Sequence, residues 1–434
     1  MRTGLAAATG LLLTAIPGPS RAGQVEGTTL VYTEPNRVTA VETAIEGSKE
    51  LKSGGSLLLK FVYDALTGAS ASGATPADRV QTFTGPSGKN SYSIAPGDTP
   101  LDPTFRDERF AGSATWIHPL GRMSQANLGM NISSETDYLS LGISGVITRD
   151  LAMRNTTLAA GFSLSHDTVD PTGGIPTALT PLTGSSADEN KGDDFQKDDD
   201  GDEGGGRSGG PAEAKDIADF LVGLTQVLDR ATIARLNYTR GYSSGYLTDP
   251  YKILSLVQSP YEAEPGEPLQ YLYENRPDRR TKQSLYGEVR RMIGSDVATA
   301  SYRYYWDSWS IHSSTLDLHL SHRFGNRTEI EPHFRIYHQH QADFYNRYLV
   351  SGRTLPTFAS ADYRIGTFTA ATYGVQAVHT LDSGLALRFG IEYYLQQGDS
   401  SPPDAFGSLV GPDLFPDVSA WMIRVGTSFP VEWW

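Results

Sequence analysis

Residues 313–340 read SSTLDLHLSHRFGNRTEIEPHFRIYHQH, and this stretch decides the fold. Apolar side chains recur at every second position on both sides of residues 325–327, with polar or charged ones between them. A period of two is typical of β-strands that have one apolar and one polar face. A three-residue turn at 325–327 makes the two apolar faces coincide and sets Arg323 opposite Glu329. The stretch therefore predicts a β-hairpin with an apolar face and a charged face.

The same register predicts further cross-strand ion pairs. It places Asp317 opposite Arg335, and a two-residue turn at 294–295 places Lys282 opposite Asp307 in a neighbouring hairpin. Opposite charges at facing positions stabilise a sheet by roughly 0.2–1 kcal/mol per pair. A slip of one residue would turn each of these side chains to the other face. The pairs were not used to choose the turns, so they support the register independently.

The alternation recurs along the chain and indicates a transmembrane antiparallel β-barrel. We expect sixteen strands, at residues 25–33, 37–46, 55–66, 108–118, 125–134, 137–148, 155–165, 215–227, 231–242, 282–292, 296–307, 313–323, 328–340, 367–380, 385–396 and 418–431. Most are longer than the about 5–6 residues of a soluble strand and suit a tilted strand that crosses a bilayer. An even number is typical of single-chain bacterial barrels, and fourteen is the alternative count. A soluble β-sandwich or solenoid also alternates, but charges of both signs on the polar faces favour a water-filled lumen.

The connections alternate between short turns and long loops. The long loops are expected at residues 67–107, 166–214, 243–281, 341–366 and 397–417. In such barrels the short turns face the periplasm and the long loops face the exterior. Residues 188–203 hold nine acids and two lysines, a net charge of −7. We therefore expect residues 185–212 to form an acidic, disordered segment.

Composition excludes several classes of protein. The 434 residues include no cysteine, so disulfides, thiolate metal sites and lipidated cysteines are excluded. The net charge of −14 argues against nucleic acid as a partner. Past the first ~20 residues, no apolar run reaches the about 18 residues that a membrane-spanning helix needs. The 45 glycines and 22 tyrosines favour sheets joined by tight turns.

Residues 1–22 have the features of a secretory signal peptide. Arg2 supplies the positive start, residues 5–16 are apolar, and Ser20 and Ala22 are small residues where a signal peptidase cleaves. The apolar part is too short to span a bilayer. We expect cleavage after Ala22 and a mature barrel at 23–434 in the bacterial outer membrane.

Aromatic residues are expected at the two membrane interfaces, where amphipathic rings settle at headgroup level. Those on apolar faces or strand ends are Trp116, Tyr302, Tyr304, Trp306, Tyr393, Trp421 and Trp433. The last alternating strand ends on aromatic residues and partly resembles the signal that the barrel-insertion machinery recognises. Outer-membrane lipid and that machinery are therefore the expected partners, and the oligomeric state is unknown.

Four short segments resemble a known family. They are VYTEPNRV at 31–38, YDALTGAS at 63–70, GYLTDPYK at 245–252 and YENRPDRR at 273–280. Together they resemble the bacterial outer-membrane family catalogued as domain of unknown function 3570. The resemblance implies an exported outer-membrane β-barrel with no established activity and hints at a link to redox biology of the cell envelope.

The charged faces of the strands are the main functional feature. The side chains expected to line the lumen and set its selectivity are Lys60, Asp64, Arg235, Glu288, Arg290, Arg303, Asp307, Asp317, His319, Arg323, Glu329, Glu331, His333, Arg335, Arg388, Glu392 and Arg424. Facing acids and bases in an open tube create a transverse field that selects polar solutes, and sixteen strands leave room for an aqueous channel. The alternative is that these charges pair with one another and fill the lumen.

The long loop after residue 242 carries a second candidate site. Its expected contact residues are Tyr246, Asp249, Tyr251, Arg276, Asp278 and Arg279. Arginines there offer donors for carboxylates, so the loop either forms a constriction that contacts a ligand or is packed by its own tyrosines and ion pairs.

Histidines give only secondary candidates for chemistry. The register sets His312 opposite His340, with His338 on the same face. We expect no metal or cofactor, and a zinc or copper site at these three histidines is the alternative. His319 faces His333 in the lumen in the same way. No nucleophile–base motif such as G-x-S-x-G or H-E-x-x-H is present, so no enzymatic activity is expected.

Three functions follow, in order of preference. The first is a porin-like channel or solute-binding pore for a small polar solute. The second is a non-conducting barrel that binds, anchors or helps assemble an envelope system, which includes a redox-linked one. The third is an outer-membrane lipid hydrolase that would use a histidine such as His118, His322 or His379.

Overall fold

The computed structural model describes residues 23–431 except 36, 53, 85–90 and 183–208. Sixteen antiparallel strands close into one barrel. In ring order they are β1 (Gln24–Thr33), β2 (Val38–Glu50), β3 (Ser56–Ala71), β6 (Leu101–Pro119), β7 (Ser124–Ser134), β8 (Tyr138–Leu151), β9 (Thr156–Val169), β10 (Glu213–Asp229), β11 (Thr232–Gly245), β14 (Arg279–Ile293), β15 (Asp296–Asp307), β16 (His312–Phe324), β17 (Thr328–Gln339), β19 (Phe368–Thr380), β20 (Ala386–Gly398) and β21 (Val418–Pro430). Pairing of β1 with β21 closes the ring. The predicted barrel and its count of sixteen are confirmed.

The predicted registers are confirmed as well. Arg323 faces Glu329 and Asp317 faces Arg335 across β16 and β17, and Lys282 faces Asp307 across β14 and β15. The local hydrophobic pattern fixes register because a slip would expose charges to lipid.

Several strands extend beyond their predicted ends on the side of the long loops. β6 begins at Leu101 instead of 108, and β3 ends at Ala71 instead of 66. Ser70 still faces Asp102 there. Backbone pairing thus continues past the alternating apolar segment, which was the only signal used to place the strand ends.

The outward faces of the strands are apolar and exposed. Phe61 is 63% exposed, Met130 65% and Val222 56%. Such a surface is unstable in water but is the lipid-facing band of a transmembrane barrel. No helix in the described part of the chain is long and apolar enough to cross a membrane.

Aromatic pairs mark the edges of the apolar band. Tyr304 lies 5.6 Å from Trp306, and Tyr393 lies 4.7 Å from Trp421, both measured between ring centroids near the long-loop ends of their strands. Trp116 lies toward the other end of the barrel, near Pro119. Trp433 lies outside the described residues.

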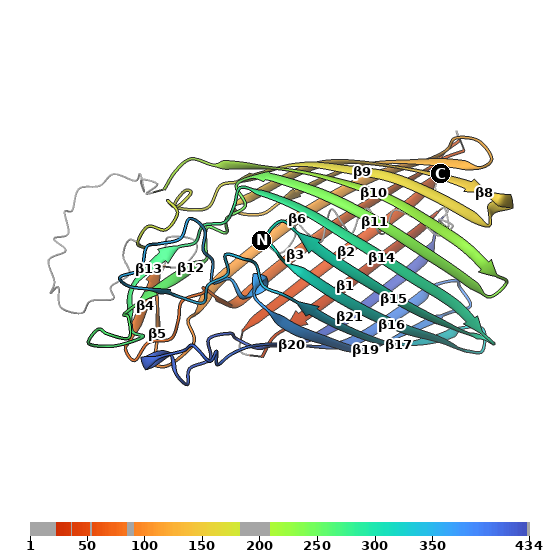
Figure 1. Cartoon of the computed structure of the whole chain (residues 1–434). Coiled ribbons are helices and arrows are strands. Elements are labelled where there is room, and N and C mark those ends of the chain that lie inside the picture. Colours follow the sequence, from red (N-terminus) through yellow and green to blue (C-terminus); the bar gives the residue numbers. More distant parts are fainter. Residues whose placement is uncertain (1–22, 36, 53, 85–90, 183–208, 432–434) are drawn as a thin grey trace, which may run out of the picture.

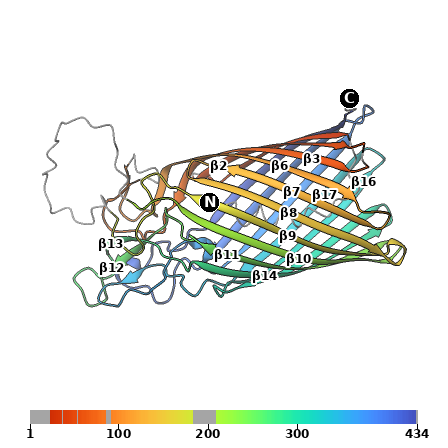
Figure 2. The same cartoon turned by 90° about the horizontal axis from the view of Figure 1, so that it is seen from above.

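The two ends of the barrel differ. Figure 1 shows short turns at one end and long loops at the other, and Figure 2 shows the same asymmetry from above. The long loops contain a three-stranded sheet of β13 (Pro268–Tyr273), β12 (Ile253–Val257) and β18 (Leu349–Val350), and a hairpin of β4 (Gln81–Thr84) with β5 (Ser91–Ile94). Short 3-10 helices are η1 (Ala152–Arg154), η2 (Tyr363–Ile365) and η3 (Gly407–Leu409).

The long loops pack together into what we call the cap, made of the described parts of residues 72–100, 246–278, 340–367 and 399–417. The largest apolar cluster at this end of the described chain joins cap residues to the barrel. It combines Ala342, Phe344, Tyr345, Ile365 and Phe415 of the cap with Trp309 and Ile311 of the β15–β16 turn and Phe368 and Ala370 of β19. This cluster packs on inward-facing wall residues such as Tyr305 and Tyr337. The cap is therefore seated on the inner wall at the long-loop end of the lumen. The acidic segment and the signal peptide proposed from sequence lie outside the described residues.

Candidate functional site

A cavity of about 480 Å³ lies between the cap and the inner wall of the barrel. The wall contributes Tyr138, Lys215, Ile217, Ser243, Arg280, Lys282, Arg303, Tyr305, Ser313, Thr315, Tyr337 and Gln339, the turn between β15 and β16 contributes Trp309 and Ile311, and the cap contributes Tyr246, Leu247, Thr248, Asp249, Arg276, Asp362, Arg364 and Ile365. Six basic side chains and four tyrosines lie in this lining beside two aspartates, which suits an anionic or strongly polar solute.

A buried ion-pair network forms the cap side of the cavity. Arg276 donates to Glu274 at 2.6 and 3.0 Å and to Asp362 at 2.8 Å. Arg364 donates to Asp362 at 2.8 Å and to Asp249 at 2.7 Å. Glu274 and Asp362 are each only 1% exposed. Charges buried this deeply persist only when they are paired and fully hydrogen-bonded.

Lys252 completes the network. Its ammonium donates to the carbonyl oxygen of Ala71 at the end of β3, and burial lowers its pKa. The three acids of the network (Asp249, Glu274, Asp362) then balance three bases (Lys252, Arg276, Arg364). With all six groups ionised the network is neutral, so its own charges attract neither anions nor cations.

The arginines control the ionisation of the two aspartates. Burial alone would raise the pKa of the Asp362 carboxyl, but the guanidinium groups of Arg364 and Arg276 outweigh burial and hold that pKa well below 3.8. For Asp249 the opposing effect of burial is likewise outweighed, by Arg364, Lys252 and Arg276, and its pKa is lowered. Both aspartates are therefore anionic at neutral pH.

The structure brings together only some of the predicted loop residues. Tyr246, Asp249 and Arg276 line the cavity. Tyr251 instead donates its hydroxyl to Asp137. The carbonyl oxygen of Asp278 accepts from Gly245 at 2.9 Å, and that of Arg279 accepts from the Trp309 indole at 3.0 Å. These last three residues hold the loop in place and do not line the cavity.

Cations on the wall side are mostly compensated. Lys215 lies 3.3 Å from Asp167, and Arg280 pairs with Asp307. Lys282 and Asp219 both lie over Gly241, where a side chain would collide with the Asp219 carboxylate. The bare glycine thus lets the two charged side chains share the inner face of β11.

Arg303 is the exception on this wall. Its guanidinium lies 5.6 Å from the centre of the Tyr286 ring and lines the cavity. Within the described ranges it makes no ion pair with a carboxylate at 4 Å or less. Arg303 therefore supplies the uncompensated positive charge of the cavity.

Sequence reasoning missed Lys215, Lys282, Asp362 and Arg364 as members of this site. Lys282 already had a place in the predicted register, and its inward face was available from the alternation. Lys215 likewise lies on a wall strand, in the predicted segment 215–227. The cap residues Asp362 and Arg364 follow no periodic pattern, so no local signal marked them.

Below the cap, the structure places the predicted selectivity residues on the inward faces of their strands, where charged positions alternate with exposed apolar ones. Acids prevail on one side of the lumen, on β1–β3: Glu26, Glu42, Glu46 and Asp64, beside Lys60. Bases prevail on β11, β14 and β15: Arg235, Lys282, Arg290 and Arg303, beside Glu288. Strand β2 is second and β14 tenth in the ring of sixteen, so the two groups face each other across the lumen. This arrangement creates a transverse field.

Many lumen charges also pair along the wall. Arg388 lies 2.6 Å from Glu26, Arg335 lies 2.8 Å from Asp317, and Arg109 pairs with Asp64. The lumen charges are therefore separated by sign across the barrel and are also partly paired along its wall.

The three rim histidines lie on the outer face. The ring centroids of His312 and His340 are 5.3 Å apart, and those of His338 and His340 are 5.8 Å apart. Nδ1 of His338 shares a hydrogen bond with Thr369 at 3.0 Å. Among the described residues, three potential metal-ligand atoms converge at a different place, in the lumen.

The histidines considered for hydrolysis lie near the short-turn end. His322 pairs with Asp296 at 2.7 Å, His379 with Thr328 at 2.9 Å, and His118 stacks on Trp116 at 4.9 Å. In the part of the chain that the structure describes, these contacts include no serine hydroxyl. They form no serine–histidine pair of the kind that acyl transfer uses.

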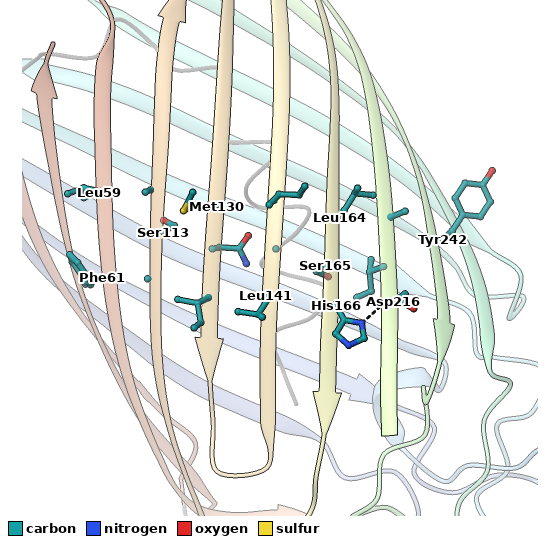
Figure 3. A pocket seen from close by; sticks show the side chains of 18 of the residues that line it. Leu59, Phe61, Ser113, Met130, Leu141, Leu164, Ser165, His166, Asp216 and Tyr242 are labelled. Atoms are coloured by element: carbon teal, nitrogen blue, oxygen red, sulfur yellow. Dashed lines mark hydrogen bonds and ion pairs between the residues drawn. The ribbon is translucent and has the colours of Figure 1, made fainter. Parts of the chain in front are cut away.

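A larger hollow, of about 930 Å³, lies on the outer wall across β3 to β11. Figure 3 shows Met130, Leu141 and Leu164 on neighbouring strands of this wall, with the His166–Asp216 ion pair at one edge. Its surface is almost wholly apolar. It belongs to the lipid-facing band and offers few groups to orient a polar solute.

Comparison with known proteins gives one family and several distant barrels. The family described as "Protein of unknown function (DUF3570)" matches residues 11–429. No curated protein matches the chain.

Three solved structures illustrate the barrels. The siderophore receptor PirA from Acinetobacter baumannii has a TM-score of 0.39 at 10% identity, over 87% of this chain and 53% of the receptor. A mutant of the ferric enterobactin receptor PfeA from Pseudomonas aeruginosa, in complex with enterobactin, has a TM-score of 0.42 at 11% identity, over 94% and 61%. A bacterial polysaccharide outer membrane secretin has a TM-score of 0.42 at 8% identity, over 94% and 99%. The chain thus spans little more than half the length of the two receptors.

Proposed function

Since the chain belongs to the DUF3570 family, whose function is unknown, its role has to be inferred from the barrel itself, and we propose that it is an outer-membrane pore that binds a small anionic solute beneath its cap. The observation that carries the proposal is the uncompensated Arg303 in the cavity. Family membership confirms the resemblance carried by residues 245–252 and 273–280.

The charges of the cavity favour an anion over a cation. The cap network is neutral, and on the wall Lys215 and Lys282 lie beside Asp167 and Asp219. Arg303 therefore adds the free positive charge among the tyrosine hydroxyls of the cavity. A guanidinium binds a carboxylate or phosphate through two parallel hydrogen bonds. A small di-anion such as phosphate or a dicarboxylate therefore suits this lining best.

Passage would be passive. The field between the acidic and basic sides of the lumen orients polar solutes, and the cap restricts entry from the exterior. A solute would reach the cavity when the cap loosens and would leave through the short-turn end, down its concentration gradient.

The test is ion selectivity in planar bilayers. Arg303→Gln should shift the reversal potential toward cations and abolish block of the current by inorganic phosphate, because it removes the free positive charge. Arg323→Gln is the matched control for phosphate block, which it should leave unchanged, since it makes the same charge change at the short-turn end of the lumen, far from the cavity. Equal phosphate block in wild type and Arg303→Gln would refute the proposed site.

A second function is favoured by the buried cap network and apolar cap cluster. Such packing suits a non-conducting barrel that binds, anchors or helps assemble a partner system of the envelope, including a redox-linked one. This function predicts no current from the wild type, nor from a variant whose cap is loosened. Current in the loosened variant alone would instead identify the cap as the gate.

Location and processing belong to the same proposal. The mature chain should fractionate with the outer membrane and begin at Gly23, which N-terminal sequencing measures. Insertion should depend on the barrel-insertion machinery and on β21. We propose no catalytic activity. Hydrolysis of phospholipid by the purified barrel would contradict this if the activity were lost on substitution of His322.

A further inference from the structure

Two histidines and an aspartate converge halfway along the lumen, below the cap and apart from the anion cavity. On β16 and β17, His319 directly faces His333, and their rings stack at 4.3 Å with 8° between planes. Nε2 of His319 lies 2.6 Å and Nε2 of His333 lies 3.5 Å from oxygens of Asp317. We propose that Asp317, His319 and His333 bind a divalent transition-metal ion of the zinc class.

The spacing of the three ligand atoms fits such an ion. They all lie within 4.8 Å of one another. Zinc bound at about 2.0–2.2 Å by tetrahedral ligands keeps them about 3.3 Å apart. The widest separation this allows has to close by about 1.5 Å, which modest rotations of the side chains supply. The metal then takes the place of the protons between imidazole and carboxylate.

A second layer of carboxylates orients both imidazoles. Nδ1 of His319 lies 3.1 Å from Glu331, and Nδ1 of His333 lies 2.8 Å from Glu392. A carboxylate that accepts from Nδ1 fixes the tautomer in which Nε2 is free to bind a metal. Each of the two histidines has such a carboxylate partner at Nδ1. Two stacked histidines that were merely hydrated in the lumen would not need these partners.

A glycine makes the outer layer possible. Gly374 on β19 lies between His333 and Glu392, facing each across its two ladders. A side chain at 374 would come within 2.5 Å of the Glu392 side chain. Its absence lets Glu392 reach across β19 to the imidazole of His333.

Charge and access also favour a cation. Three carboxylates (Asp317, Glu331, Glu392) surround the two imidazoles, and the nearest ion-paired base is Arg335, 2.8 Å from Asp317. Once the metal has displaced one proton from each imidazole, the three carboxylates and Arg335 carry a net charge of −2, which a divalent ion neutralises. Side-chain exposures of 12–30% leave the ligands open to lumen water, which would fill the remaining coordination positions. Arg335 is half exposed and competes for Asp317 as a displaceable counter-ion.

The experiment measures metal binding by the mature barrel, purified without a polyhistidine tag and treated with a chelator. Titration with Zn²⁺ followed by calorimetry should give one site per chain, and Co²⁺ should give visible absorption bands of nitrogen and oxygen ligation. His333→Gln should weaken Zn²⁺ binding at least 100-fold. Glu392→Gln and Gly374→Ala should weaken it about 10–100-fold, the usual effect of losing an outer-layer partner. Arg335→Gln should strengthen it.

Matched controls separate this site from the rim histidines and from misfolding. His312→Gln and His338→Gln remove the same side chain from the outer face and should leave Zn²⁺ affinity unchanged. Each variant must keep the heat-modifiable migration of a folded barrel, and Glu392→Gln tests the site without touching a ligand. No stoichiometric Zn²⁺ binding, or equal binding by wild type, His333→Gln and Glu392→Gln, would overturn the proposal. Its failure would leave the anion site beneath the cap unaffected, because that site is assayed by Arg303→Gln.

Discussion

At the scale of single residues, Asp362 shows how the cap is held. Its carboxylate accepts from Arg276 and Arg364, which come from two different loops, and it is nearly inaccessible to solvent. The loss of one partner from a buried ion-pair network lowers the free energy of unfolding by more than the intact network adds to it. The reason is that the remaining charges stay buried without a partner.

Asp362→Asn should therefore loosen the cap while the barrel remains folded. The expected cost is about 3–5 kcal/mol, the usual effect of leaving a buried charge unpaired. Limited proteolysis should then cut the loops at 246–278 and 340–367, with the heat-modifiable migration of the barrel unchanged. Asp382→Asn is the matched control, because its ion pair with Arg327 lies in an exposed turn and adds little. Resistance equal to wild type would show that the network does not hold the cap.

At the scale of elements, β16 shows the separation of faces most clearly. Leu318 lies at the middle of the strand on the outward face, and its neighbours Asp317 and His319 point into the lumen. The same strand thus meets lipid on one side and water on the other.

Leu318→Arg should destabilise the barrel in lipid by about 2–4 kcal/mol, the cost of a basic side chain at the bilayer midplane on a lipid-facing position. Ser321→Arg, on the inward face of the same strand, should cost much less because its charge stays in water. Reversible urea unfolding in liposomes compares the two. Equal losses would mean that the outward face of β16 does not contact lipid.

At the scale of the whole molecule, the ionisation of the cap network makes the stability of the cap depend on pH. The folded pKa values of Asp249 and Asp362 lie below the ordinary 3.8. The stability that they contribute is therefore fully present above about 3.8 and is lost as pH falls through the lower folded values. Burial raises the pKa of Glu274 above 4.5. Protonation of Glu274 as the pH falls therefore favours the folded cap and partly offsets the stability lost at the two aspartates.

The cap should thus stay in place between pH 7 and pH 5 and loosen only below about pH 4. Protease resistance of the loops, or bilayer current, measured from pH 7 to pH 3, reports this transition. Asp362→Asn should already be loose at pH 7 and show little further change. A transition of the wild type near pH 6 would point to histidines and away from the cap network.

The contacts within one hairpin could be predicted from sequence, whereas those that other strands bring to it could not. The hairpin at 313–340 fixed its own register, so the pairing of His319 with His333 was predictable. Glu392 reaches His333 from 59 positions away, and only the pairing of β19 with both β17 and β20 brings them together. Of the two outer-layer carboxylates of the proposed metal site, Glu331 therefore lies within the hairpin, whereas Glu392 had no signal in it.

By itself the sequence determined the barrel, its sixteen strands and the inward or outward direction of each side chain. The physical reason is that a two-residue period and short turns are local properties, which lipid on one face and water on the other enforce at every strand. Only the tertiary structure decided the cap and its cavity. Asp249 and Arg364 are 115 positions apart, and Arg276 and Asp362 are 86 apart, so their pairing depends on how non-periodic loops pack over the finished barrel.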